Sequence, residues 1–219
     1  FRTLEARRFY CEEELRLIKR AHKITQEMLR RVPSALRSTT TERALAWKLR
    51  TWAQELGADR LSFDPIVAFG THTSRPHHHP TTRSLKKGHI VQIDVGAVFK
   101  GYCADLSEVF FTAKPTEEQK HLYDLLCATK DAVKAAAKPG VTSLHLDTLA
   151  RDMLEKEDLD AFFTHALGHG VGLDVHEIPT LSQAKPGTKL LVGEVLAIEP
   201  AVYFPGKWGM RVEEMVVIS

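Results

Sequence analysis

Two apolar segments of the chain contain carboxylic acids where an ordinary strand would carry hydrophobic residues. In the first, Asp94 and Asp105 lie on either side of the turn-forming pair Lys100-Gly101. A hairpin centred between Phe99 and Lys100 would place the two aspartates directly opposite each other, with Cβ atoms about 5 Å apart. Two ionised carboxylates at that separation repel each other unless a proton or a metal ion lies between them. For this hairpin alone, a slipped register with one exposed aspartate is an equal alternative.

A second hairpin has the same feature. Glu199 ends an apolar run, and a hairpin centred on Gly206 places it opposite Glu213. Because side chains alternate along a strand, Glu214 would face the other way, unless a bulge at Pro200 reverses the alternation. Four converging carboxylates in apolar surroundings carry too much negative charge for a dry site without divalent cations. The two hairpins together predict a site for two metal ions, with ligands that suit Mn, Co, Fe or Zn.

Histidines gather in two further segments. His165, His169 and His176 share a short stretch in which glycines flank His169 and allow close approach of the backbone. The alternating glycines are also compatible with a phosphate loop, but the lysine of such a loop is missing. The adjacent residues His77–His79 offer one or two side chains to a site, and a surface metal trap is the alternative reading. Three histidines in one glycine-rich stretch favour a functional site there.

These segments follow two successive runs of helices. Apolar spacing and capping residues predict helices over 12–31, 42–56, 116–138 and 143–156. Strand texture is present over 63–70, 89–112, 162–169, 190–204 and 210–218. Two helices followed by strands, twice over, predict an α+β fold with two pseudo-equivalent halves. No low-complexity linker divides the halves, so residues 1–219 are expected to form a single domain.

Composition narrows the function classes. The chain has 219 residues, of which 43% are apolar and 26% charged, as in an ordinary globular protein. A net charge of +2 gives no indication of a nucleic-acid or membrane surface, and no apolar run approaches the roughly 18 residues that span a bilayer. Three widely spaced cysteines predict reduced thiols and a cytoplasmic location. Because Phe1 is not an initiator, we expect the chain to be cut from a longer protein.

Taken in order, these motifs resemble the pita-bread metallopeptidases, the family of methionine aminopeptidases, prolidases and aminopeptidases P. The matching features are the Asp94/Asp105 spacing, the GHGVG segment around His169, the His176-Glu-x-Pro segment, Glu199-Pro and Arg-Val-Glu213. The likeness covers essentially the whole chain. It implies a pita-bread fold, in which pseudo-two-fold halves of helices pack on a curved antiparallel sheet. It also implies two divalent ions as cofactors, Mn, Co or Zn, with Mn favoured.

The resemblance further implies roles for the acids. Asp94 would bind one ion, whereas Asp105 and Glu213 would bridge both. His169 and Glu199 would complete the second ion. Glu199 would also take the proton of the attacking water.

Other residues would form the substrate pocket. The resemblance places His77, His165 and His176 in the pocket, where His77 and His176 would steady the scissile carbonyl. The proline before His77, together with His165, Tyr203 and Arg211, favours the proline-specific branch of the family. Arg211 is a permanent cation beside the carboxylates and is expected to hold Asp94 and Tyr203 in register.

The chain departs from the family pattern in two ways. Ser107-Glu108 stands where the family commonly has Thr-Arg. The sequence also does not include the N-terminal domain usual in proline-specific members, so we expect it to be an excised catalytic domain. The implied function is hydrolysis of the Xaa-Pro bond in dipeptides or at peptide N-termini. A proline-containing peptide would be the substrate, and a homodimer is expected for the full-length protein. The alternatives are a methionine aminopeptidase and a non-catalytic binding module with the same fold.

Overall fold

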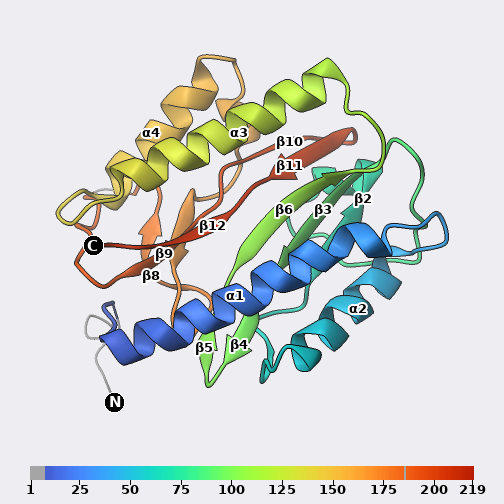
Figure 1. Cartoon of the computed structure of the whole chain (residues 1–219). Helices are drawn as coiled ribbons and strands as arrows, with labels where there is room; N and C mark the ends of the chain where they lie inside the picture. The colour runs from blue at the N-terminus through green and yellow to red at the C-terminus, as the bar shows by residue number, and fades with distance from the viewer. Residues whose placement is uncertain (1–7, 185) are drawn as a thin grey trace.

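Two pairs of helices pack along the strands of two similar halves (Figure 1). The computed structural model describes residues 8–184 and 186–219. The first half contains α1 (Glu12–Ala35), α2 (Glu42–Glu55), β1 (Arg60–Leu61), β2 (Ile66–Phe69), the 3-10 turn η2 (Gly70–Ser74), β3 (Ile90–Val95), β4 (Ala97–Phe99), β5 (Tyr102–Cys103) and β6 (Leu106–Phe111). The second contains α3 (Glu117–Ala136), α4 (Ser143–Glu155), the 3-10 turn η3 (Asp160–Phe162), β7 (Gly168–Gly170), β8 (Glu177–Leu181), β9 (Val195–Ile198), β10 (Ala201–Phe204), β11 (Trp208–Arg211) and β12 (Glu214–Val217).

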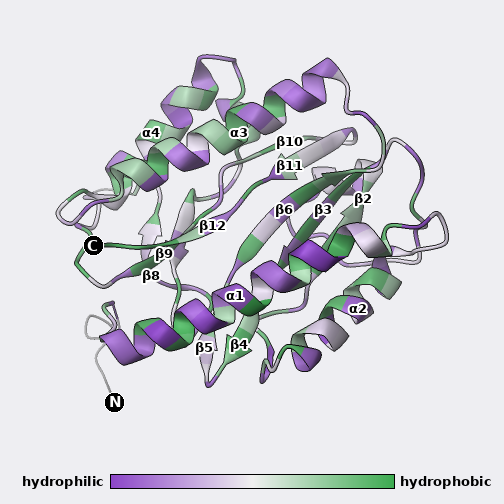
Figure 2. Ribbon diagram, viewed as in Figure 1, coloured by the Kyte–Doolittle hydropathy of each residue, from purple (hydrophilic) through white to green (hydrophobic). Residues whose placement is uncertain are grey.

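The helices are amphipathic, as their sequence spacing predicts. Hydrophobic and hydrophilic residues alternate along α1 and α3 (Figure 2), and most of the buried residues of α1 and α2 join one core with β2 and β3. A second core packs α3 and α4 against strands of the second half, through residues such as Leu126, Leu146 and Ile198. The four predicted helices are confirmed. Among the described residues, none of the helices combines the length and apolarity needed to cross a membrane.

The second helix of each half starts in the same way. The hydroxyls of Thr41 and Thr142 accept hydrogen bonds from the backbone amides three residues on, at 3.1 and 3.2 Å. Each threonine also forms a β-bridge to the segment that leads into the central strands, Thr41 with Ser84 and Thr142 with Lys189. The two halves therefore share one local design, which agrees with the predicted pseudo-two-fold arrangement.

The register predicted for the first acid pair is wrong. Lys100 and Gly101 both adopt positive φ, 49° and 84°, so the turn is centred between them and Asp94 pairs with Ser107. Asp105 falls between β5 and β6, two residues away from the predicted partner position. Because the shift is an even number of residues, Asp105 keeps the strand face that the alternation assigned to it.

The register predicted for the second acid pair is confirmed. Ala201 pairs with Arg211 on one side of the acids, and Ile198 pairs with Glu214 on the other. Glu199 and Glu213 lie in the break between these two ladders, opposite each other. The alternation is therefore undisturbed by a bulge.

Residues 162–169 do not form the predicted strand; of this stretch, only Gly168 and His169 lie in a strand, β7. Two backbone carbonyls of this stretch, those of Phe163 and His165, are bound by a side chain. Arg151 of α4 donates to the carbonyl oxygens of Phe163 and His165, at 3.0 and 2.8 Å. These two carbonyls have hydrogen-bond partners without strand pairing, so the apolar residues of the segment wrongly indicated a strand there.

Gly96 is required where β3 passes into β4. A Cβ atom at this position would lie 1.8 Å from the carbonyl oxygen of Ala104, directly before Asp105. We expect Gly96→Ala to lower the free energy of unfolding by about 3 kcal/mol or more, because backbone must move to admit the methyl group. Gly206→Ala is the matched control: it strains a turn with φ of 73° but meets no atom within 4 Å, and costs about 1 kcal/mol. Urea unfolding measures both, and equal losses would contradict the close-approach argument.

Candidate metal centre

A cavity of about 530 Å³ lies between the strands of the two halves. Nine of the residues that the sequence singled out line it: His77, Asp94, Asp105, His165, His169, His176, Glu199, Arg211 and Glu213. The first half contributes His77, Asp94 and Asp105, and the second half contributes the others. The two hairpins and the glycine-rich segment, distant in sequence, therefore meet in one cavity.

The acids converge because each lies at or near a strand end. Asp94 is the penultimate residue of β3, and the other three acids occupy breaks between strands. Potential ligand atoms of Asp94, Asp105 and Glu213 lie within 4.8 Å of one another, and the same holds for His169, Glu199 and Glu213. A third group of this kind contains Asp105, His169 and His176. The three groups overlap in their members and so form one continuous cluster.

Backbone hydrogen bonds fix the broken strands. The amide of Glu213 donates to the carbonyl oxygen of Ser107 at 3.0 Å and thereby joins the second half to β6 of the first. The amide of Glu199 donates to the carbonyl oxygen of Leu167 at 2.8 Å. The backbone amides of Glu199 and Glu213 are therefore hydrogen-bonded although both residues lie outside the strand pairing.

The surroundings of these carboxylates disfavour the ionised form. Burial raises the pKa of Asp105 and of Glu213, and the neighbouring carboxylates raise both further, against the lowering effect of Arg211. Burial also raises the pKa of Glu199. Two buried oxygens, Oδ1 of Asp94 and Oδ1 of Asp105, lack a hydrogen-bond partner in the described part of the chain. Orphaned buried oxygens among repelling acids fit the donor set of a divalent metal site.

His169 presents the form of imidazole that binds metals. Burial lowers its pKa to about 4, so the ring is neutral near pH 7. Its Nδ1 lies 3.0 Å from the carbonyl oxygen of Gly170 and donates to it, which leaves the lone pair on Nε2. That nitrogen is 3.7 Å from oxygens of both Asp105 and Glu199. The tautomer and the aim of the ring therefore suit a ligand.

Arg211 ties the acids to their surroundings. Only 2% of its surface is exposed, and its guanidinium donates to Asp94, to the hydroxyl of Tyr203 at 2.5 Å and to the hydroxyl of Ser107 at 2.9 Å. Its backbone is held in turn by the amide side chain of Gln92, at 2.8 and 3.0 Å. The contacts expected of Arg211 with Asp94 and Tyr203 are both present.

A chain of hydrogen bonds leads from Arg211 to His165, which forms part of the cavity wall. The Tyr203 hydroxyl, which accepts from Arg211, lies 3.2 Å from Nε2 of His165. His165 is neutral because burial lowers its pKa to about 4, and its Nδ1 donates to the carbonyl oxygen of Ala166, so Nε2 accepts from the tyrosine. In the described residues Tyr203 stands behind this wall and not on the cavity surface. His176 packs edge-on against His169, with ring centroids 4.4 Å apart.

The remaining histidines and acids divide between the cavity and other surroundings. His78 is buried against Glu42, whereas His79 is exposed. Glu214 faces away from the cluster, as the alternation predicted, and pairs with His22 at 2.6 Å.

Sequence reasoning missed several residues of the wall. Asp174 and Glu177 flank His176, and their closeness to that histidine was a usable signal. Phe63 and Ile66 form an apolar part of the wall, and no spacing in the sequence marks them.

Similarity to known proteins agrees with this geometry. A dipeptidase of Pyrococcus horikoshii, named Xaa-Pro dipeptidase, is 33% identical over 208 residues, which are 95% of this chain and 59% of that protein. The solved prolidase of Pyrococcus furiosus is 32% identical with a TM-score of 0.95, over 98% of this chain and 64% of that one. The X-Pro aminopeptidase of Thermotoga maritima is 33% identical with a TM-score of 0.94, over 98% and 61%.

The pita-bread fold predicted from the motifs is confirmed by these structural matches. The chain spans less than two thirds of the length of these relatives. The model of metallopeptidase family M24 matches residues 16–219. Because that match covers nearly the whole chain, the chain belongs to metallopeptidase family M24.

Proposed function

We propose that this chain is the catalytic part of a dinuclear metal-dependent peptidase that cleaves the Xaa-Pro bond, in dipeptides or at peptide N-termini. The observation that carries the proposal is the meeting of four acids and a neutral imidazole in one cavity, with two buried carboxylate oxygens lacking a partner in the described residues. The names of the relatives, Xaa-Pro dipeptidase, prolidase and X-Pro aminopeptidase, favour proline specificity over a methionine aminopeptidase. The retained acids favour an enzyme over a binding module.

Five residues would hold the ions: Asp94, Asp105, His169, Glu199 and Glu213. Oxygen ligands predominate, so we favour Mn over Co and Zn. When bound, the two ions supply Lewis acidity, which lowers the pKa of water and polarises the scissile carbonyl.

Glu199 is the best-placed proton carrier. Burial raises its pKa, which brings a carboxylate nearer to the range in which it both takes and releases a proton at neutral pH. It would receive the proton of the attacking water and deliver it to the departing proline nitrogen. His176 and His77 line the same cavity and would donate hydrogen bonds to the carbonyl oxygen as negative charge develops there.

Part of the cavity lining suits a proline ring. Phe63 and Ile66 provide apolar surface, and His165 is neutral and already bound on both ring nitrogens. Arg211 and Tyr203 hold His165 relative to Asp94. An apolar pocket next to the acids would accept the ring without leaving a polar group unpaired.

We further propose that residues 1–219 act as one catalytic domain, in a full-length protein that is a cytoplasmic homodimer. The widely spaced cysteines support a reducing compartment. The dimer rests on the resemblance to the family.

Metal dependence has a direct test. A chelator is expected to abolish hydrolysis of an Xaa-Pro peptide, and Mn should restore it. Asp105→Asn should bind less metal and lose activity by about 10³-fold or more, because a shared ligand loses its charge. Glu214→Gln is the matched control, since this adjacent acid faces away from the cavity, and it should keep both properties. Metal analysis and peptide hydrolysis measure the outcome; full activity of Asp105→Asn would remove the acids from the mechanism.

Substrate preference has a separate test. We expect kcat/KM for an Xaa-Pro dipeptide or tripeptide to exceed that for Met-Ala peptides by about 100-fold or more, because the pocket wall fits the ring. Comparison of di- and tripeptides of equal sequence also separates a dipeptidase from an aminopeptidase. A preference for Met-Ala would replace the proposal with a methionine aminopeptidase.

A further inference from the structure

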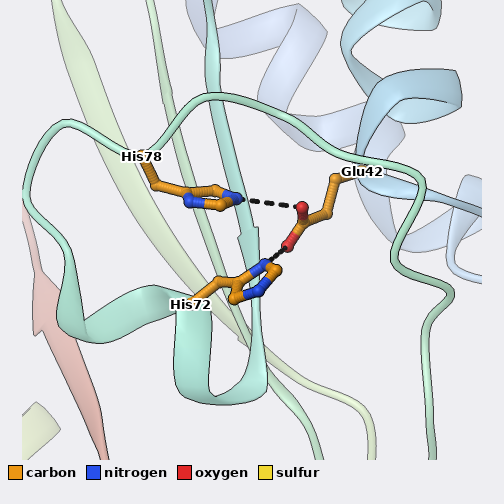
Figure 3. Close-up of side chains that lie close together, drawn as sticks. All are labelled: Glu42, His72 and His78. Carbon is orange, nitrogen blue, oxygen red and sulfur yellow. Dashed lines mark hydrogen bonds and ion pairs between the residues drawn. The ribbon is translucent and has the colours of Figure 1, made fainter. Parts of the chain in front are cut away.

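A second buried acid lies outside the metal cluster. The carboxylate of Glu42, at the first position of α2, has no exposed surface. It lies beside the neighbouring rings of His72 and His78, with a different oxygen facing each ring (Figure 3). Oε1 accepts from His72 Nδ1 at 2.8 Å and from the Phe69 amide at 2.9 Å. Oε2 accepts from His78 Nε2 at 2.9 Å and from the amide and hydroxyl of Thr81 at 2.9 and 2.6 Å.

These five hydrogen bonds stabilise the charged form of Glu42. Burial alone would raise its pKa, but the hydrogen bonds from Thr81, His78 and Phe69 outweigh burial and lower the pKa. The carboxylate therefore stays ionised at neutral pH and remains an acceptor for every donor around it.

The geometry favours a hydrogen-bonding centre over a metal ion. The two histidine nitrogens approach different oxygens of the carboxylate, and each oxygen already accepts from a backbone amide. An ion at this place would need nitrogen lone pairs directed at a common point. Here the histidine nitrogens act as donors to an acceptor that is fully used.

All five donors belong to one segment, residues 69–81, which carries His77 into the cavity. Phe69 begins the segment and Thr81 ends it, so one carboxylate closes the loop at both ends. The residue before His77 is fixed as well, because the carbonyl oxygen of Pro76 accepts from Arg211 at 3.3 Å. His77 thus stands between a neighbour bound to Arg211 and a neighbour bound to Glu42.

We propose that Glu42 is a positioning residue for His77: it holds the loop so that the exposed imidazole faces the acids. The proposal rests on the proposed function, since it assigns Glu42 its role through a pocket histidine. It extends that function to a residue that lines no part of the cavity in the described chain.

The other half of the fold provides a comparison. Ser143 is the first residue of α4, as Glu42 is of α2, and its hydroxyl accepts from the amide of Thr188 at 3.0 Å. That bond ties α4 to the segment before β9 but involves none of the proposed site residues. Ser143→Ala therefore removes a buried hydrogen bond at the corresponding position, away from His77.

Glu42→Gln is the most informative substitution. Whichever way the new amide group turns, its NH₂ faces a backbone N–H, of Phe69 on one side or of Thr81 on the other, and neither can reverse. We expect hydrogen exchange at the amides of Phe69 and Thr81 to become about tenfold faster or more. In Ser143→Ala these two amides should keep their wild-type rates. Unchanged exchange in Glu42→Gln would overturn the role of the carboxylate in holding the loop.

A double-mutant cycle connects the loop to catalysis. Glu42→Gln is expected to lower kcat/KM for an Xaa-Pro peptide about tenfold with the metal content of the cluster unchanged. In a His77→Ala background the same substitution should cost less than about twofold, because the group it positions is gone. Ser143→Ala should have the same small effect in both backgrounds. Additive losses of Glu42→Gln and His77→Ala would overturn the positioning role, whereas an inactive wild type would contradict the proposed function itself.

Variants of His78 provide a milder test and a rescue. His78→Leu removes one of the five donors. Like Glu42→Gln, it should speed hydrogen exchange at the amides of Phe69 and Thr81 and lower kcat/KM. His78→Gln retains an amide donor near the position of Nε2 and should recover most of the activity. Metal analysis tests whether Glu42, His72 and His78 instead bind a metal ion. If His78→Leu loses one equivalent of metal per chain while the cluster acids are unchanged, this centre is a metal site and the proposal is overturned.

Discussion

The constraint on which the rest of the structure depends is the mutual repulsion of four carboxylates gathered in one cavity. Asp105 and Glu213 are each destabilised as anions by burial and by the neighbouring acids. A chain left to relax would turn such side chains toward water. The fold prevents this by anchoring the strand breaks that carry them to rigid ladders on both sides. Three clusters of buried hydrophobic residues among the described residues hold those ladders in place.

The positive charge of Arg211 partly compensates the negative charge of these acids. Of the described residues that line the cavity, it alone carries a permanent positive charge, and it is shared among Asp94, Ser107 and Tyr203. One cation cannot neutralise four acids, so the cavity keeps an excess of negative charge that divalent ions would satisfy. The same guanidinium fixes the Tyr203–His165 wall. The proposed substrate pocket and the acid cluster are therefore parts of one hydrogen-bonded unit.

Strand alternation explains how much of this site was predictable. The face of each acid depends only on parity, and parity is preserved by an even shift of register. Asp105 was assigned to its face although its predicted partner, Asp94, in fact pairs with Ser107. The choice of Glu213 over Glu214 succeeded for the same reason. The strand expected over 162–169 failed because Arg151, distant in sequence from the carbonyls it binds, replaces the ladder. Long-range side-chain contacts of this kind leave no local pattern.

Glu42 differs from Asp105 and Glu213 in how the protein surrounds a buried carboxylate. Five donors surround Glu42, and its pKa is lowered. Asp105 and Glu213 have raised pKa values, and an oxygen of Asp105 has no partner in the described residues. The difference lies in the neighbours: backbone amides and histidine donors surround the first acid, whereas further acids surround the others. A carboxylate already satisfied by the protein stabilises a loop, whereas carboxylates that the protein leaves unsatisfied favour the binding of a proton or of a metal cation. The number of donors that reach each acid therefore distinguishes Glu42 from the carboxylates that we propose as metal ligands.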